Sequence, residues 1–182
     1  MQLAGQALPG VFLIEHDSFE DARGAFFESW NERALSAAGI EARFVQENVS
    51  VSRRFVLRGL HYQIPQAQGK LVRVLAGEIF DVIVDLRRSS GAFGRWLEVR
   101  LNAIERRSLW VPAGLAHGFL ALAHDTQVQY KVTDFWAPGA ERTLAWNDPA
   151  LGITWPLPAG ISPILSDKDR HGQPLAAAET YP

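Results

Sequence analysis

The chain has 182 residues, 47% hydrophobic and 21% charged, and its 18 Lys and Arg against 20 Asp and Glu give a net charge of −2. This size suits one sizeable core, so we expect a single domain over residues 1–182 with its core over about 10–174. The charge balance leaves no excess of cations for a polymer of phosphates, and we expect no nucleic-acid partner. The lack of cysteine excludes disulfides, thiolate zinc sites and Cys nucleophiles.

No apolar run reaches the roughly 18 residues that a membrane helix needs, and residues 1–10 lack the basic and apolar parts of a signal peptide. We therefore expect a cytoplasmic protein with no membrane partner.

Alternation of apolar and polar residues with a period of two dominates the chain and predicts strands. In chain order we expect them at Val11–Glu15, Phe44–Val51, Leu57–His61, Lys70–Leu75, Ile79–Arg87, Leu97–Leu101, Ser108–Val111, Gly118–Ala123, Thr126–Asp134 and Arg142–Trp146. Gly77 predicts a hairpin turn between the fourth and fifth of these strands. One short helix is expected over Glu32–Ala38, with Asn31 as its N-cap and Gly39 at its end.

Many short strands separated by Gly and Pro turns are typical of an antiparallel sandwich or closed barrel, and not of alternating strands and helices. The last 25 residues are rich in Pro, Gly and Ala, and we expect them to wrap the surface of the barrel. The expected fold class is all-β.

Polar side chains gather in residues 46–50, 58–63 and 68–70. If the first two segments are strands, Gln46 and Asn48 share a face, and Arg58 on an adjacent strand joins them at a barrel mouth. For Gln46 and Asn48 alone we favour an ordinary solvated sheet face. Arg58 and His61 flank Gly59, which would let a ligand approach the backbone closely.

A Pro-x-Gly turn at residues 112–114 delivers His117 to the start of a strand, in a pattern that resembles the second motif of the cupin superfamily. Metal-binding cupins add an H-x-H pair and a nearby Glu, whereas residues 61–63 hold only His61, and Glu78 is the nearest acid downstream. The other histidines have no ligand-like spacing: His16, His124 and His171. The set is incomplete for a transition metal, so we predict a barrel without one.

Several of these residues suit proton transfer. His61 needs a carboxylate that fixes its tautomer, and Asp169 is a candidate, although alone it is better explained as a loop residue. Tyr130 is by default a half-buried packing residue, but a phenol in a pocket also donates a proton. With Lys70 as a fixed cation beside an enolate oxygen, the set suits deprotonation and reprotonation of a carbon next to a carbonyl.

The motifs around these residues resemble the dTDP-4-dehydrorhamnose 3,5-epimerase family from about residue 10 to 174. The most specific are Arg58-Gly59-Leu60-His61-Tyr62-Gln63 and Gln68-Gly69-Lys70-Leu71. The resemblance implies a homodimeric, cupin-like jelly-roll barrel that uses no metal or cofactor. It also implies a dTDP-sugar substrate, dTDP-4-dehydro-6-deoxy-D-glucose, epimerised at carbons 3 and 5 to dTDP-4-dehydro-L-rhamnose for a bacterial surface polysaccharide.

By this resemblance His61 is the base, Asp169 its partner, Tyr130 the acid and Lys70 the cation that stabilises the enolate. It also implies three groups of substrate-binding residues: Arg23, Arg58 and Lys168 at the diphosphate or nearby polar groups, Phe26, Glu28, Gln46, Asn48 and Trp136 around the nucleotide, and His117 in the same pocket. In the family the segment over residues 23–28 comes from the partner subunit.

Four positions depart from the family pattern: Phe55, Asn102, Leu115 and Val132. Phe55 and Leu115 are the two that could reshape the pocket. Three other functions stay open. One is a mono-epimerase that acts on carbon 3 or carbon 5 of a related dTDP-4-keto-6-deoxy sugar. The others are a metal-dependent cupin enzyme and a non-catalytic carbohydrate-binding jelly roll.

Overall fold

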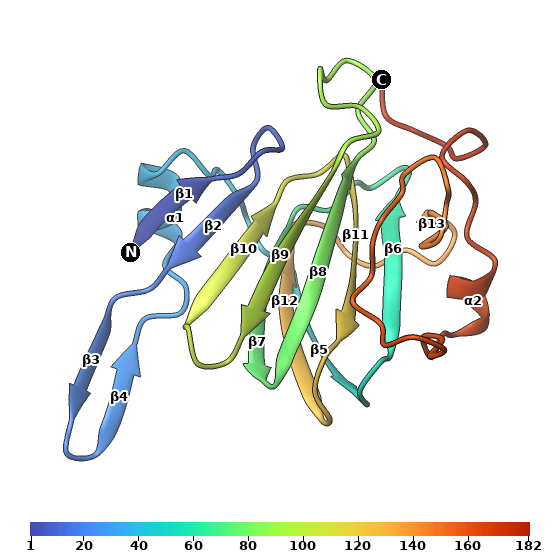
Figure 1. The fold of residues 1–182 in the computed structure, drawn as a ribbon. Helices are drawn as coiled ribbons and strands as arrows, with labels where there is room; N and C mark the ends of the chain where they lie inside the picture. The colour runs from blue at the N-terminus through green and yellow to red at the C-terminus, as the bar shows by residue number, and fades with distance from the viewer.

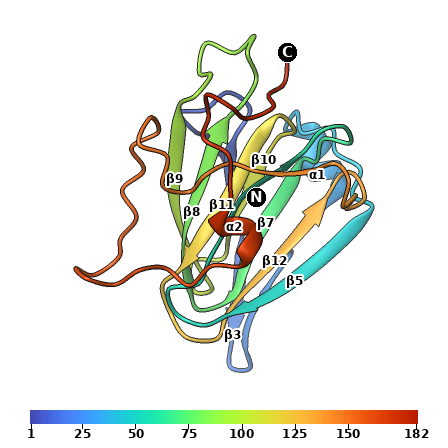
Figure 2. The same ribbon diagram turned by 90° about the vertical axis from the view of Figure 1, so that its right-hand side faces the viewer.

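The computed structural model describes residues 1–182 as two antiparallel sheets packed face to face (Figure 1, Figure 2). The larger sheet contains, in spatial order, β1 (Gln2–Gly5), β2 (Phe12–Glu15), β10 (Arg107–Val111), β7 (Lys70–Ala76), β12 (Thr126–Val132) and β5 (Gln46–Ser52). The smaller sheet contains β13 (Glu141–Thr143), β6 (Leu57–Gln63), β11 (Leu115–Ala121), β8 (Glu78–Asp85) and β9 (Trp96–Asn102). The expected all-β, jelly-roll class is confirmed.

Two short strands and two short helices lie outside these sheets. A separate hairpin of β3 (Ser18–Asp21) and β4 (Gly24–Phe27) projects from the body (Figure 1). The two helices are α1 (Glu32–Ala37) and α2 (Asp167–Arg170), and neither is long and apolar enough to cross a membrane. As expected, Asn31 caps α1, its side chain accepting a hydrogen bond from the backbone N–H of Ala34 at 3.1 Å.

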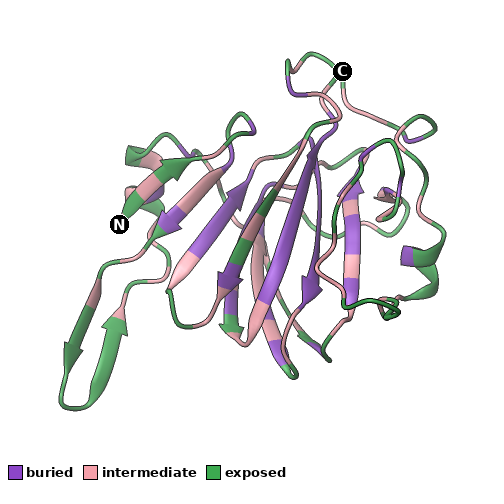
Figure 3. Cartoon of the chain, viewed as in Figure 1, coloured by how far each residue is buried: buried purple, intermediate pink, exposed green.

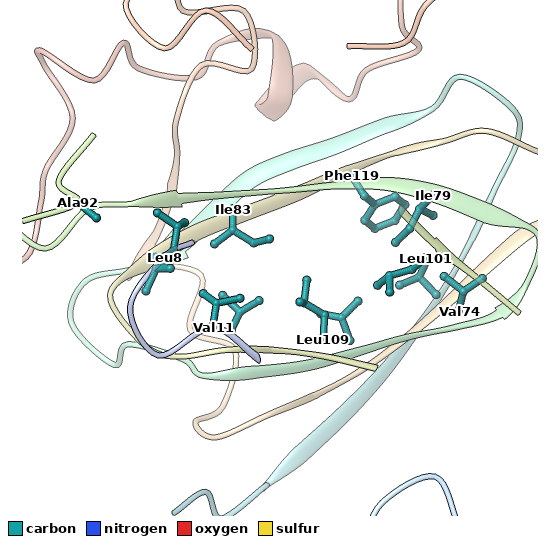
Figure 4. Close-up of a cluster of buried hydrophobic side chains, with 13 residues drawn as sticks. Leu8, Val11, Val74, Ile79, Ile83, Ala92, Leu101, Leu109 and Phe119 are labelled. Carbon is teal, nitrogen blue, oxygen red and sulfur yellow. The ribbon is translucent and has the colours of Figure 1, made fainter. Parts of the chain in front are cut away.

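The main core lies between the two sheets, where inward-facing residues of both layers meet (Figure 4). Val72 and Val74 of β7 and Leu109 of β10 come from the larger sheet, and Ile79 and Ile83 of β8 from the smaller. Each strand contributes alternate residues, which is why a period of two in the sequence marks this core.

The two central strands of the smaller sheet, β11 and β8, are buried on both faces. Every residue of β11 is buried, and all but the first of β8 (Figure 3). The outer face packs against the chain beyond β13, where Phe80 and Val82 lie in one cluster with Trp155 and Tyr181. The expected wrapping by the C-terminal segment is confirmed, and it covers the outer face of the sheet that carries β6.

Gly77 joins β7 to β8, but the expected hairpin is wrong. β7 pairs with β10 and β12 in the larger sheet, whereas β8 pairs with β9 and β11 in the smaller one. At Gly77 φ is +79°, and a Cβ there would lie 2.5 Å from Oγ1 of Thr126. The glycine therefore lets the chain pass in a tight turn from the larger sheet to the smaller one.

Candidate active site

A cavity of about 690 Å³ is lined by residues of β5, β7 and β12 from the larger sheet, of β6, β11 and β13 from the smaller one, and of the segment that carries α2. Ten of the thirteen site residues expected from the sequence line it: Gln46, Asn48, Arg58, His61, Lys70, His117, Tyr130, Trp136, Lys168 and Asp169. The fold thus brings together residues that are up to 123 positions apart, from 46 to 169.

His61 and Asp169 form a hydrogen-bonded pair in this cavity, with 2.5 Å between Nε2 and Oδ1. Asp169 is buried and lies on α2, which is capped by Ser166. The hydroxyl of Ser166 donates to Oδ2 of Asp169 at 2.7 Å. Asp169 is therefore held from two sides and is not the ordinary loop residue that its sequence context favours.

In this pair the imidazole of His61 is neutral and the carboxyl group of Asp169 is ionised. Burial lowers the pKa of His61, although the hydrogen bond and charge of Asp169 act against it. Burial raises the pKa of Asp169, but the hydrogen bonds from His61 and Ser166 bring it below its ordinary value. At neutral pH a neutral imidazole then donates its Nε2 proton to a carboxylate. Nδ1 has no hydrogen-bond partner in the chain and can accept a proton.

A bulge in β6 places Arg58 and His61 on the same side of the strand. Residues three apart in a regular strand point to opposite faces. Here His61 pairs with His117 and Arg58 with Phe119, so β6 contains one residue more than β11 over the same stretch. The extra residue restores a common face, and both side chains line the cavity.

Gly59 lies within the bulge. Its φ is +124°, and a Cβ there would lie 2.5 Å from Cα of Gly118 on the neighbouring strand. The glycine is required by the close approach of two strands, and the expectation that it admits a ligand is wrong.

Lys70 is a buried cation at the start of β7. Its Nζ donates to the backbone carbonyl of His61 at 3.2 Å. Burial lowers the pKa of Lys70 to about 8, while the charges of Glu141 and Asp81 act to raise it. The ammonium form therefore prevails at neutral pH.

Tyr130 lines the cavity from β12, in the sheet opposite His61. Burial raises the pKa of its phenol, and the charge of Arg58 offsets this only in part. The hydroxyl has no hydrogen-bond partner in the chain. Tyr130 thus presents a protonated phenol to the cavity.

A second His–carboxylate pair lies beside the first. Nε2 of His117 is 2.8 Å from Oδ2 of Asp81, a fully buried residue of β8 whose Oδ1 has no partner. Sequence reasoning did not select Asp81 or Glu141. For Asp81 a signal existed, because a charged residue flanked by Phe80 and Val82 within an apolar stretch of a strand needs a buried partner.

The remaining cavity residues hold one another in place. Arg58 donates to Oγ of Ser52 at 3.0 Å, and Lys168 to Oε1 of Glu141 at 2.8 Å. Gln46 and Asn48 face the cavity, so the solvated-face interpretation is wrong. β5 and β6 lie in different sheets, so Arg58 faces β5 across the cavity and not from an adjacent strand.

Arg23, Phe26 and Glu28 do not line the cavity of their own chain. Arg23 lies at the tip of the β3–β4 hairpin and pairs with Asp21 at 2.5 Å, while Phe26 is 71% exposed. Glu28 follows the hairpin and accepts a hydrogen bond from Nδ2 of Asn31 at 3.1 Å. Within one chain these three expected binding residues stay apart from the other ten.

Nowhere in the chain do three His, Asp or Glu side chains gather as a metal site requires. The four positions that depart from the family pattern also lie outside the cavity lining: Phe55, Asn102, Leu115 and Val132. Phe55 has a φ of +65°, a conformation that favours glycine.

Comparisons with known proteins agree along the full length of the chain. A family model described as dTDP-4-dehydrorhamnose 3,5-epimerase matches residues 5–177. The dTDP-4-dehydrorhamnose 3,5-epimerase of Pseudomonas aeruginosa is 54% identical over 183 residues, which cover 100% of both chains.

Two solved structures of similar fold carry bound sugar nucleotides. The first is a dTDP-6-deoxy-D-glucose-3,5-epimerase from Legionella pneumophila in complex with dTDP-4-keto-L-rhamnose. It matches with a TM-score of 0.92 and 42% identity, over 98% of this chain and 94% of that chain. The second is a 3'-monoepimerase from Streptomyces bikiniensis in complex with dTDP-quinovose. It matches with a TM-score of 0.87 and 36% identity, over 94% and 86% of the two chains.

Proposed function

The chain belongs to the dTDP-4-dehydrorhamnose 3,5-epimerase family, and we propose that its cavity performs the family's reaction with His61, Asp169, Tyr130 and Lys70. The protein is an isomerase of dTDP-rhamnose biosynthesis. It converts dTDP-4-dehydro-6-deoxy-D-glucose to dTDP-4-dehydro-L-rhamnose in the cytoplasm, as one domain. The observation that carries the proposed roles is the placement of a neutral His61, hydrogen-bonded to the carboxylate of Asp169, and a protonated Tyr130 on opposite sheets around one cavity.

His61 removes the proton in this proposal. The 4-keto group of the substrate acidifies the hydrogens on carbons 3 and 5, which flank it. Nδ1 of His61 takes one of these protons, and the electron pair of the broken C–H bond moves to the keto oxygen to form an enolate. The carboxylate of Asp169 stabilises the imidazolium that results.

Lys70 and Tyr130 complete the step. The buried ammonium of Lys70 stabilises the negative oxygen of the enolate, where burial strengthens the interaction. Tyr130 then donates its proton to the same carbon from the opposite face of the sugar ring, which inverts the centre. Both reacting carbons flank one keto group, so the same base and acid serve them in turn, once His61 has released its proton to solvent and Tyr130 has regained one from it.

The cations of Arg58 and Lys168 suit the diphosphate of the substrate, and Trp136 offers a ring to its nucleotide. Lys168 would exchange its present partner, Glu141, for a phosphate oxygen. Gln46, Asn48 and His117 supply polar groups for the base and the sugar.

We further propose that the protein acts as a homodimer. Phe19 and Phe26 pair across the β3–β4 hairpin and are 67% and 71% exposed, a degree of exposure that a partner would relieve. A second copy that covers this hairpin would receive Arg23, Phe26 and Glu28 at its own cavity. Light scattering should give twice 20.2 kDa for the native chain. The double substitution of Phe19→Ser and Phe26→Ser should lower the measured mass toward 20.2 kDa and weaken substrate binding.

Deuterium exchange tests the proposed reaction. In deuterated water with dTDP-4-dehydro-6-deoxy-D-glucose, we expect label at both carbon 3 and carbon 5 of the product. Label at one carbon only would establish a mono-epimerase, a class that also shares this fold. Binding of the sugar nucleotide without any exchange would establish a non-catalytic binding protein.

A further inference from the structure

The segment between β12 and β13 carries two exposed aromatic rings, Phe135 and Trp136, of which Trp136 lines the cavity and is 56% exposed. Loops of this kind are ordinarily mobile, because few contacts order them. Here three glutamine side chains hold the backbone of residues 134–137.

Gln63, the last residue of β6, makes the central contacts. Its Nε2 donates to the carbonyl of Phe135 at 3.2 Å and to that of Gln66 at 2.8 Å. Its Oε1 accepts from the N–H of Ala137 at 2.9 Å. One buried amide therefore bonds the backbone on both sides of Trp136 and ties it to the loop that follows β6.

Two further glutamines form hydrogen bonds with Trp136 and Asp134, whose backbone groups Gln63 does not contact. Oε1 of Gln46 accepts from the N–H of Trp136 at 3.0 Å. Nε2 of Gln68 donates to the carbonyl of Asp134 at 2.8 Å. Each of the four consecutive residues 134–137 thus has a backbone group bonded to Gln46, Gln63 or Gln68, which we call the glutamine clamp.

We propose that Gln63 is a positioning residue that fixes Trp136 as a rigid platform for the nucleotide end of the substrate. The proposal rests on the proposed function, from which the ligand, a thymidine diphosphate sugar, is taken. A ring that is ordered before binding loses less conformational entropy when a base stacks on it, so the clamp contributes to affinity. Gln63 makes no hydrogen bond to the four proposed catalytic residues, and its effect should fall on binding and not on chemistry.

Two substitutions separate hydrogen bonding from packing. Gln63→Met keeps the length of the side chain and removes all three hydrogen bonds. Gln63→Glu keeps size and the acceptor but turns an oxygen toward the carbonyls of Gln66 and Phe135. We expect both to raise KM and the Kd of dTDP by about tenfold and to leave kcat within about twofold. If Gln63 acted only through packing, Gln63→Glu would leave KM and the Kd of dTDP unchanged.

Tyr181→Phe is the matched control. The hydroxyl of Tyr181 donates to the backbone carbonyl of Gln63 at 2.7 Å, so this variant disturbs the same residue without touching its side chain. The Kd of dTDP should stay within about twofold of that of the native protein.

A double-mutant cycle with Trp136→Ala tests whether Gln63 acts through Trp136. We expect Gln63→Met to weaken dTDP binding in the native chain and to add no more than about twofold once Trp136 is gone. If the Gln63 variants fail to fold, Gln68→Met releases the same loop from a less buried position and enters the cycle instead.

The proposed role of Gln63 is contradicted if folded Gln63 variants bind dTDP as tightly as the native protein, or if their kcat falls as far as their kcat/KM. It is also contradicted if the effects of Gln63→Met and Trp136→Ala on dTDP binding are additive. Affinity for dTDP is measured without turnover. A native protein that binds dTDP but exchanges no substrate protons would therefore overturn the proposed reaction and leave the clamp standing.

Discussion

His61 and Asp169 lie 108 positions apart in the sequence and meet at 2.5 Å between Nε2 and Oδ1. The contact joins a strand of the smaller sheet to a helix of a single turn. The carboxylate fixes which nitrogen of the ring carries the proton, and so which one faces the substrate as a base.

Asp169→Asn should lower kcat by about 10²- to 10⁴-fold, since it removes the charge that stabilises the imidazolium. Asp169 also raises the pKa of His61, so the acidic limb of the kcat/KM profile should move to lower pH in the variant. Asp167→Asn, in an exposed position on the same helix, is the control. Equal kcat in the two variants would contradict the role of Asp169.

Lys70 should set the alkaline limit of activity. With its pKa lowered to about 8, its ammonium is present below that pH and lost above it, and kcat should fall accordingly. Lys70→Arg keeps a cation to far higher pH and should move this limb upward, at some cost in kcat from its larger size. If the alkaline fall in kcat stays near pH 8 in Lys70→Arg, it reports the titration of a group other than Lys70.

Glu141→Gln and Lys168→Met should shift that alkaline limb in opposite directions. Both break the same 2.8 Å ion pair. The charge of Glu141 raises the pKa of Lys70 and that of Lys168 lowers it, so the first variant should move the limb below pH 8 and the second above it. Shifts of the same sign in pH–rate profiles would show that only the integrity of the pair matters.

Tyr130→Phe should slow reprotonation and release incompletely epimerised sugar, while proton removal by His61 continues. Nuclear magnetic resonance of the products and of deuterium exchange at both carbons measures the two steps separately. Native rates and products from this variant would rule out Tyr130 as the acid.

Gly59→Ala should lower the free energy of unfolding by about 3 kcal/mol or more, because an L side chain is strained at its positive φ and its Cβ would meet Gly118. Gly91→Ala, where a Cβ meets nothing within 4 Å, should change stability by no more than about 0.5 kcal/mol. Urea unfolding of both variants measures the difference. Equal stability would mean that the bulge in β6 tolerates a side chain.

The sequence was sufficient where a local rule decides the structure. Strict alternation located the strand at Leu97–Leu101 inside β9 (Trp96–Asn102), and Asn31 located the start of α1. Strands β3 and β4 were missed because Gly24–Phe27 and Ser18–Asp21 do not alternate and bury little.

Local sequence patterns did not reveal how strands pair or which residues far apart in the sequence come together. The alternation on both sides of Gly77 is the same for a hairpin and for a crossing between sheets. The bulge at Gly59 shifts the face of Arg58 relative to His61, which no period of two foresees. The candidate site followed from motif resemblance, while only the fold showed that Gln63 and Glu141 line the cavity and that Asp81 bonds His117 from behind.

Proton exchange and dTDP binding, measured together in His61→Ala, test most directly whether His61 is the base. We expect exchange of deuterium into carbons 3 and 5 to fall by about 10³-fold or more, while the Kd of dTDP stays within a few-fold of that of the native protein. Exchange at both carbons at close to the native rate, with dTDP still bound, would contradict this role of His61.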